Sequence, residues 1–149
     1  ISHQTPDTIR SVLEAEGHPI FSSKELVDRF DHFVAENETF LPGAANALAQ
    51  GDLEMFGTFV DRSQNLGASL LKNQVPETVF LAQEARRLGA VAASAFGAGF
   101  GGSVWALVPD TAVGPLLTGW EDAYRTEFPY RALRARFFAT DSGPAAFEI

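Results

Sequence analysis

The chain of 149 residues contains no cysteine, and this absence excludes several chemistries. Without a thiol there is no disulfide framework, no cysteine nucleophile and no thiolate zinc site. Long apolar runs are also missing, because no stretch approaches the roughly 20 residues that a membrane-spanning helix needs. Residues 1–4 include neither Met nor a basic region, so we expect no signal peptide and a chain that begins inside a longer one. A cytoplasmic protein without a membrane partner is the simplest expectation.

Basic residues are scarce, with 11 Lys and Arg against 19 Asp and Glu and a net charge of −8. A protein that binds nucleic acid through its phosphates needs a basic face, so we expect no nucleic-acid partner. Hydrophobic residues make up 46% of the chain and 13 residues are Phe, which predicts a packed core. A chain of this length is expected to form one domain over residues 1–149.

Helix start and stop signals predict that most of the first 90 residues are helical. Thr5 before Pro6 is typical of a helix N-terminus, and Ser22 with Glu25 forms a capping box for the next helix. Pro42 is expected to kink or end that second helix. The apolar stripe expected on it comprises Leu26, Phe30, Phe33 and Val34. Other helices are expected over residues 6–16, 44–49, 76–88 and 112–126. A further helix is expected after its cap Asp52, with Leu53, Phe56, Phe59 and Val60 at helical spacing.

The residue pattern changes after residue 89, where strands are expected. Residues 90–96 are small and apolar without a helical stripe, and residues 103–108 are rich in strand formers. This pattern predicts a strand, a glycine turn and a second strand. Further strands are expected at residues 135–139 and 145–149. Helices followed by strands predict an α+β domain in which the helices pack on one sheet.

The glycine-rich loop between the first two expected strands is the most informative stretch of the chain. It comprises Gly97, Ala98, Gly99, Phe100, Gly101, Gly102 and Ser103. Glycine adopts positive φ easily and lets backbone N–H groups approach a ligand, and successive N–H groups in a turn can hold an anion. The loop therefore indicates a phosphate or nucleotide ligand. A tight hairpin that packs its strands closely would use the same glycines, and the residues alone leave both interpretations open.

The residues around the loop exclude three well-known phosphate-binding motifs. The dinucleotide fingerprint needs a helix directly after its glycines, whereas a strand is expected here. The P-loop needs a lysine after its last glycine, and the protein-kinase pattern needs one on the following strand. The chain has two lysines, Lys24 and Lys72, and both precede the loop.

The loop with its flanks resembles a motif of a known family. Residues 88–108, LGAVAASAFGAGFGGSVWALV, resemble the third motif of the GHMP kinase superfamily in its galactokinase form, which reads G-[GA]-G-F-G-G, a small residue and an apolar strand. Further pieces resemble the family in the same order. The family's R-x-x-H-V-V-x-E-N helix is matched at Arg29, His32, Val34, Glu36 and Asn37. Its G-D-L-x-x-F-G helix is matched at residues 51–57, with Ser63 after it, and P-E is matched at Pro76 and Glu77. The resemblance covers about residues 24–149.

Several positions depart from the family pattern. Gln64 stands where many galactokinases have a histidine, and residues 94–96 replace R-M-T before the loop. Residues 72–75 replace the Y-E-V-S-C region, and residues 78–79 replace L-D. These departures leave the sugar open, so the resemblance is to a galactokinase-like enzyme rather than to galactokinase itself.

The resemblance implies a fold, a reaction and a binding site. The fold would be a ferredoxin-like α/β plait with additional N-terminal helices. The reaction would be transfer of the γ-phosphoryl group of ATP to a sugar hydroxyl, with ATP and Mg²⁺ as cofactors. The loop from Gly97 to Ser103 would bind nucleotide or substrate. No catalytic residue and no metal ligand is assigned to this chain.

The resemblance also implies a missing half. The family's sugar-recognition signature, its G-L-S-S-S-A phosphate loop and its catalytic acid belong to an N-terminal domain, and none of them occurs here. The chain would be a C-terminal domain whose partner is its own N-terminal kinase domain, and it would be inactive alone. The alternative is a non-catalytic ligand-binding or regulatory module on the same fold.

Other polar residues are weaker candidates. The three histidines are scattered and show no metal-ligand spacing. Arg86 and Arg87 fit stabilisation of a helix C-terminus, with substrate contact as the alternative. Residues 72–74 form the most polar break between apolar helices and are a candidate for the substrate cleft. Trp105 is expected in the core.

Overall fold

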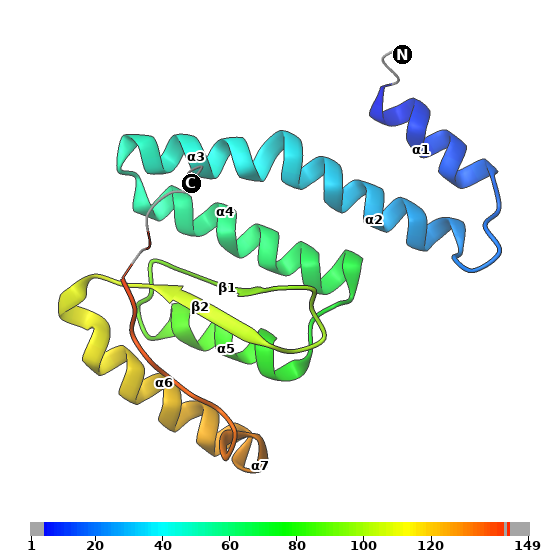
Figure 1. Ribbon diagram of the computed structural model, residues 1–149. Coiled ribbons are helices and arrows are strands. Elements are labelled where there is room, and N and C mark those ends of the chain that lie inside the picture. Colours follow the sequence, from blue (N-terminus) through cyan, green and yellow to red (C-terminus); the bar gives the residue numbers. More distant parts are fainter. Residues whose placement is uncertain (1–4, 142, 144–149) are drawn as a thin grey trace, which may run out of the picture.

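The structure is a computed structural model that describes residues 5–141 and 143. Figure 1 shows α2 and α3 as one long rod, α4 folded back beneath it, and the sheet between α4 on one side and α5 and α6 on the other. Its elements are α1 (Pro6–Ala15), α2 (Ser23–Ala35), η1 (Glu36–Phe40), α3 (Leu41–Gln50), α4 (Leu53–Leu66), η2 (Gly67–Leu71), α5 (Pro76–Arg87), β1 (Ala92–Phe96), β2 (Ser103–Leu107), η3 (Asp110–Ala112), α6 (Val113–Glu127) and α7 (Pro129–Ala132). None of the described helices is long and apolar enough to cross a membrane.

The helix termini lie where the capping residues predict them. The Thr5 hydroxyl accepts the N–H of Thr8 at the start of α1. Ser22 and Glu25 form the reciprocal capping box of α2, in which the Ser22 N–H donates to Glu25 Oε2 at 2.9 Å. Gly51 ends α3 in the left-handed conformation with φ 72°. These ends are set by local hydrogen bonds, which is why the sequence predicts them.

The rod of α2 and α3 bends at η1, as expected near Pro42 (Figure 1). Pro42 has no N–H to donate, and its ring would press on a carbonyl of the preceding turn in a regular helix. The chain widens into a π turn there, so that the Leu41 N–H donates to the Glu36 carbonyl five residues back. In a regular α-helix, residues seven apart, such as Phe33 and Phe40, lie on nearly the same face. The π turn adds a residue to the turn between them, so the two rings lie on different faces. Phe40 is buried and Phe33 is 62% exposed, so the prediction of an inward Phe33 is wrong.

The two-stranded antiparallel sheet confirms the predicted strand, glycine turn and strand. Ala92 pairs with Leu107 at one end and Phe96 with Ser103 at the other. Together with the helices, the sheet confirms the α+β class.

The strand predicted at residues 135–139 is wrong, because the described residues after 134 form no strand. The Phe137 ring instead packs on α6, with its centroid 5.4 Å from that of Trp120 and 5.9 Å from that of Tyr124. Aromatic packing rather than a hydrogen-bond ladder holds this segment. The strand predicted at residues 145–149 lies outside the described residues.

The core lies between α5, the sheet and α6. Its buried members are Ala82, Ala85, Ala90, Ala93, Leu116 and Trp120. The alanines let the α5 backbone approach the sheet closely, and the Trp120 indole N–H donates to the Leu81 carbonyl at 2.9 Å. Trp105, expected in the core, is half-buried. This packing fixes both strands, and thereby both ends of the glycine loop.

Candidate functional site

The glycine loop between β1 and β2 has a backbone that ordinary residues rarely adopt. Positive φ angles occur at Gly97 (101°), Gly99 (90°), Phe100 (62°), Gly101 (116°) and Gly102 (105°). A glycine takes these angles freely, whereas a side chain there costs on the order of 1–3 kcal/mol. Phe100 adopts the left-handed conformation despite its side chain, which is 75% exposed. Such backbone strain is typical of functional sites.

The segment that leads from η2 into α5 forms a wall against this loop. The Phe100 N–H donates to the Asn73 carbonyl. A Cβ added to Gly99 would lie 2.5 Å from that same carbonyl oxygen and 2.7 Å from Asn73 Cβ. Gly99 is therefore required both for its φ and for the close approach of Asn73. The structure thus brings residues 72–74, a candidate for the cleft, to the predicted loop.

The far end of β1, next to the loop, is held by a neutral amide. Gln64 on α4 accepts the Ser94 hydroxyl at 2.9 Å and the Ala95 N–H at 3.0 Å, both through Oε1. Gln64 and Ser94 are two of the positions that depart from the family pattern. In this chain the two departing side chains therefore contact each other directly. The contact between Gln64 and Ser94 was not predicted from the sequence. The only indication of it there is that both positions depart from the family pattern.

A second amide continues this contact toward the loop wall. Gln74 Oε1 accepts the hydroxyl of the buried Thr78 at 2.8 Å and lies 3.4 Å from Gln64 Nε2. Gln74 Nε2 donates to Asn73 Oδ1 at 3.3 Å. The amides therefore form a chain from β1 through α4 and α5 to the residue that contacts the loop. Because every member is neutral, the chain positions the loop without placing a charge beside it.

Several backbone N–H groups of the loop have no acceptor within the described residues. Within residues 5–141, the N–H of Phe100 has a protein acceptor, whereas those of Gly97, Gly99 and Gly101 have none. The loop surface is largely exposed. Successive N–H groups without a protein acceptor, in a turn with positive φ angles, can bind the oxygens of an anion. A phosphate group is the ligand that this arrangement suits.

Arg86 lies at the opposite end of β1 and has a structural role. Its guanidinium donates to both Asp61 carboxylate oxygens at 2.9–3.1 Å and also to the carbonyls of Ala90 and Val91. Arg87 pairs with Glu84, and the hydrogen bond that it donates holds the pKa of this carboxyl below its ordinary value. Both arginines are therefore engaged by the protein, and the structure gives no support to a contact with substrate.

Three residues of the helical segments that resemble the family lie close together between α2 and α4. The Ser63 hydroxyl donates to Glu36 Oε1 at 2.6 Å, and His32 Nε2 lies 3.7 Å from the same oxygen. In a nucleophilic triad the histidine stands between the serine and the acid, so that it can take the serine proton. Here the acid occupies the middle, so the cluster connects the helices and does not activate Ser63.

Neither a cluster of metal ligands nor the surface hollow of the described residues offers a better site than the loop. Among the described residues, no group of three or more His, Cys, Asp and Glu side chains is placed to hold a metal ion. A surface hollow of about 450 Å³ between η2, α5 and α6 includes Gln74 in its lining but no residue of the loop. The glycine loop with its Asn73 wall is therefore the candidate site.

Comparison with known proteins gives consistent matches. A family model described as GHMP kinases C terminal matches residues 44–125. A galactokinase from Exiguobacterium sibiricum is 33% identical over 132 residues, which is 87% of this chain and 32% of that protein. A galactokinase from Enterococcus faecalis is 34% identical over 110 residues, 72% of this chain and 28% of that protein. The chain thus spans about a third of the length of these relatives.

Proposed function

Because this chain belongs to the GHMP kinase family, in which it matches the C-terminal domain, we propose that it is the C-terminal half of an ATP-dependent, galactokinase-like sugar kinase. The family match covers residues 44–125 and so includes β1, the glycine loop and β2. The galactokinases extend the similarity over most of the chain. The enzyme would transfer the γ-phosphoryl group of ATP to a sugar hydroxyl.

The observation that carries this proposal is the glycine loop with its positive φ angles and open N–H groups. Phosphoryl transfer depends chiefly on positioning and on electrostatic stabilisation of the phosphate oxygens. N–H groups that are already fixed donate to such oxygens without reorganising during the reaction. The contact between Asn73 and Phe100 holds those donors in place. The loop would then form one wall of the phosphate site.

The remainder of the site would come from the N-terminal domain of the same protein. ATP bound there would supply the phosphoryl group. The resemblance places the family's catalytic acid and sugar-recognition signature in that domain, and we assign the catalytic acid and the sugar contacts to it. We assign Mg²⁺ to it as well, since no group of three or more carboxylate or histidine side chains gathers among the described residues of this chain.

The direct test is a kinase assay on the full-length protein with galactose, arabinose and uronic acids as acceptors. We expect phosphorylation of at least one sugar and loss of turnover in Gly99→Val, because the new side chain would collide with Asn73. Gly17→Val is the matched control, since Gly17 has open space around it and lies far from the loop in the sequence. Unchanged kinetics in Gly99→Val would show that the loop is not part of the site.

A second test addresses the missing half. The isolated chain should show no kinase or ATPase activity, and turnover by it alone would contradict the half-site proposal. The residues encoded before Ile1 in the gene should include a phosphate loop and a catalytic acid. Their absence would favour the non-catalytic module.

A further inference from the structure

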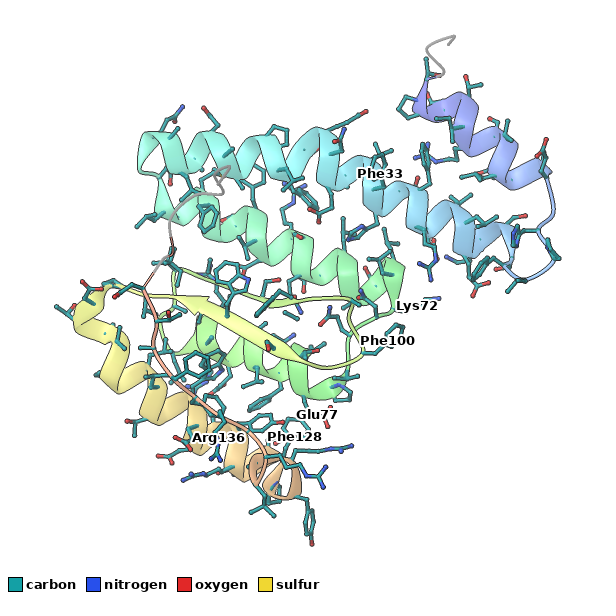
Figure 2. The ribbon with its side chains drawn as sticks, viewed as in Figure 1. Phe33, Lys72, Glu77, Phe100, Phe128 and Arg136 are labelled. Carbon is teal, nitrogen blue, oxygen red and sulfur yellow. The ribbon has the colours of Figure 1, made fainter. Side chains whose placement is uncertain are left out.

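Lys72 ends η2 in a backbone conformation that is unusual for lysine. Its φ is 53°, in the left-handed region that favours glycine. Within residues 5–141 the only other non-glycine residue with positive φ is Phe100, and the two segments are joined by the bond from the Phe100 N–H to the Asn73 carbonyl. Figure 2 shows Lys72 and Phe100 at the same edge of the molecule. The strained turn therefore places Lys72, a cation, beside the glycine loop.

Lys72 forms no ion pair within the described part of the chain. Lys24, the other lysine, pairs with Asp28 at 2.7 Å, whereas no carboxylate oxygen of residues 5–141 lies within 4 Å of the Lys72 ammonium. Lys72 is exposed on its flexible four-carbon stem. Glu25 at the start of α2 is close enough to sense it: after the hydrogen bonds from Ser22, the charge of Lys72 helps to keep the pKa of Glu25 below its ordinary value.

The loop itself lacks such a charge. Its open donors are neutral N–H groups, and the amides behind it are neutral as well. Arg86 and Arg87 are both engaged by carboxylates. A nucleotide phosphate with several negative charges needs a cation in addition to dipoles, and a lysine is a common partner for it. Lys72 is the cation that the fold brings to this edge.

We propose that Lys72 binds the phosphate groups of the nucleotide at the glycine loop. This inference rests on the proposed function. Lys72 would contact phosphate oxygens from the η2 side while the loop N–H groups donate from the other. The contact of Asn73 with Gly99 and Phe100 fixes the chain directly after this left-handed turn.

A purely structural role is the rival explanation, since a cation at a helix C-terminus also interacts favourably with the helix dipole. Lys72→Gly separates the two roles. It removes the ammonium, but it also relieves the strained φ and so preserves or raises the melting temperature. Lys72→Gln removes the charge alone, and Lys72→Arg retains it. Lys24→Gln is the matched control, because it removes the other lysine from a helix face.

The experiment uses the full-length protein and measures kcat and KM for MgATP, together with calorimetric binding of a non-hydrolysable ATP analogue. We expect Lys72→Gln and Lys72→Gly to weaken binding and raise KM about tenfold, with a smaller change in kcat. The affinity and KM of Lys72→Arg should stay within about threefold of the wild-type values. Those of Lys24→Gln should equal the wild-type values. Nucleotide affinity in Lys72→Gly equal to that of the wild type would overturn the proposal.

The two proposals fail in distinguishable ways. If the wild-type protein neither binds the analogue nor phosphorylates a sugar, the proposed function itself is wrong, and the Lys72 inference is wrong with it. If the wild type is active and the Lys72 variants behave like Lys24→Gln, only the Lys72 inference is wrong.

Discussion

The two ends of β1 are held in opposite ways. At the first end, Arg86 donates to Asp61 and to the carbonyls of Ala90 and Val91. At the second end, the neutral Gln64 accepts the Ser94 hydroxyl and the Ala95 N–H. At the charged end, the Arg86 N–H groups donate to acceptors of the protein. The neutral end leads into a loop in which several N–H groups have no acceptor among the described residues. The difference favours the second end for the proposed phosphate site, since a phosphate would meet the Asp61 carboxylate at the first end and open N–H groups at the second.

The largest expected effect comes from breaking the charged end. Arg86→Met leaves the half-buried Asp61 carboxylate and the two carbonyls without their donor, which should lower the free energy of unfolding by about 2 kcal/mol. Urea denaturation measures this change. Arg87→Met is the matched control, because its exposed pair with Glu84 should contribute under about 1 kcal/mol. Equal effects of the two substitutions would contradict the anchoring role of Arg86.

The next effect separates backbone strain from contact in the loop. Gly99→Ala introduces both a strained φ and a collision with Asn73, and should cost about 2 kcal/mol of unfolding free energy. Gly101→Ala has a similar φ but open space around its Cβ, and should cost about 1 kcal/mol. Both values come from denaturation curves. A larger loss in Gly101→Ala would mean that Asn73 does not press on the loop.

A smaller effect is expected at the neutral end. Gln64→Met keeps the length of the side chain but removes the acceptor of the Ser94 hydroxyl and the Ala95 N–H. Because both groups are half-buried and water can partly replace the amide, the expected loss is about 1 kcal/mol of unfolding free energy. A double substitution with Ser94→Ala should cost less than the sum of the single ones. Additive losses would indicate that the two side chains do not interact.

The smallest effect is a dependence of stability on pH at the N-terminus of α2. The Ser22 hydroxyl and N–H donate to the Glu25 carboxylate and hold its pKa below the ordinary value of 4.5. Because the folded-state pKa is lowered, this contribution to stability is present above pH 4.5 and is lost as the pH falls through the lowered value. Glu25→Gln should therefore lower the melting temperature at pH 7 and make no difference at pH 2. An equal decrease at both pH values would contradict the capping role of the charge.

Local features of the fold were predictable from the sequence, and distant contacts were not. The caps at Thr5 and Ser22 and the glycine hairpin depend on neighbouring residues, so their patterns indicate them directly. The exposure of Phe33 depends on the π turn after it, and the irregular path of residues 135–139 depends on the aromatic rings of α6. No local pattern contains that information.

The candidate site was predictable to the same extent. Its glycines and the polar break at residues 72–74 were both visible in the sequence. Their contact was not, because it joins Asn73 to Phe100 across 27 positions that only the packing of α4, α5 and the sheet brings together.

The central claim is that the loop at the neutral end of β1 binds nucleotide phosphates, and amide hydrogen exchange in the full-length protein tests it most directly. Exchange is followed with and without a non-hydrolysable ATP analogue and Mg²⁺, with calorimetry confirming that the analogue is bound. The account predicts that bound nucleotide slows exchange within residues 97–102, above all at Gly97, Gly99 and Gly101, whose N–H groups have no protein acceptor among the described residues, and leaves residues 90–93 unchanged. Unchanged exchange across residues 97–102 with nucleotide bound would contradict it.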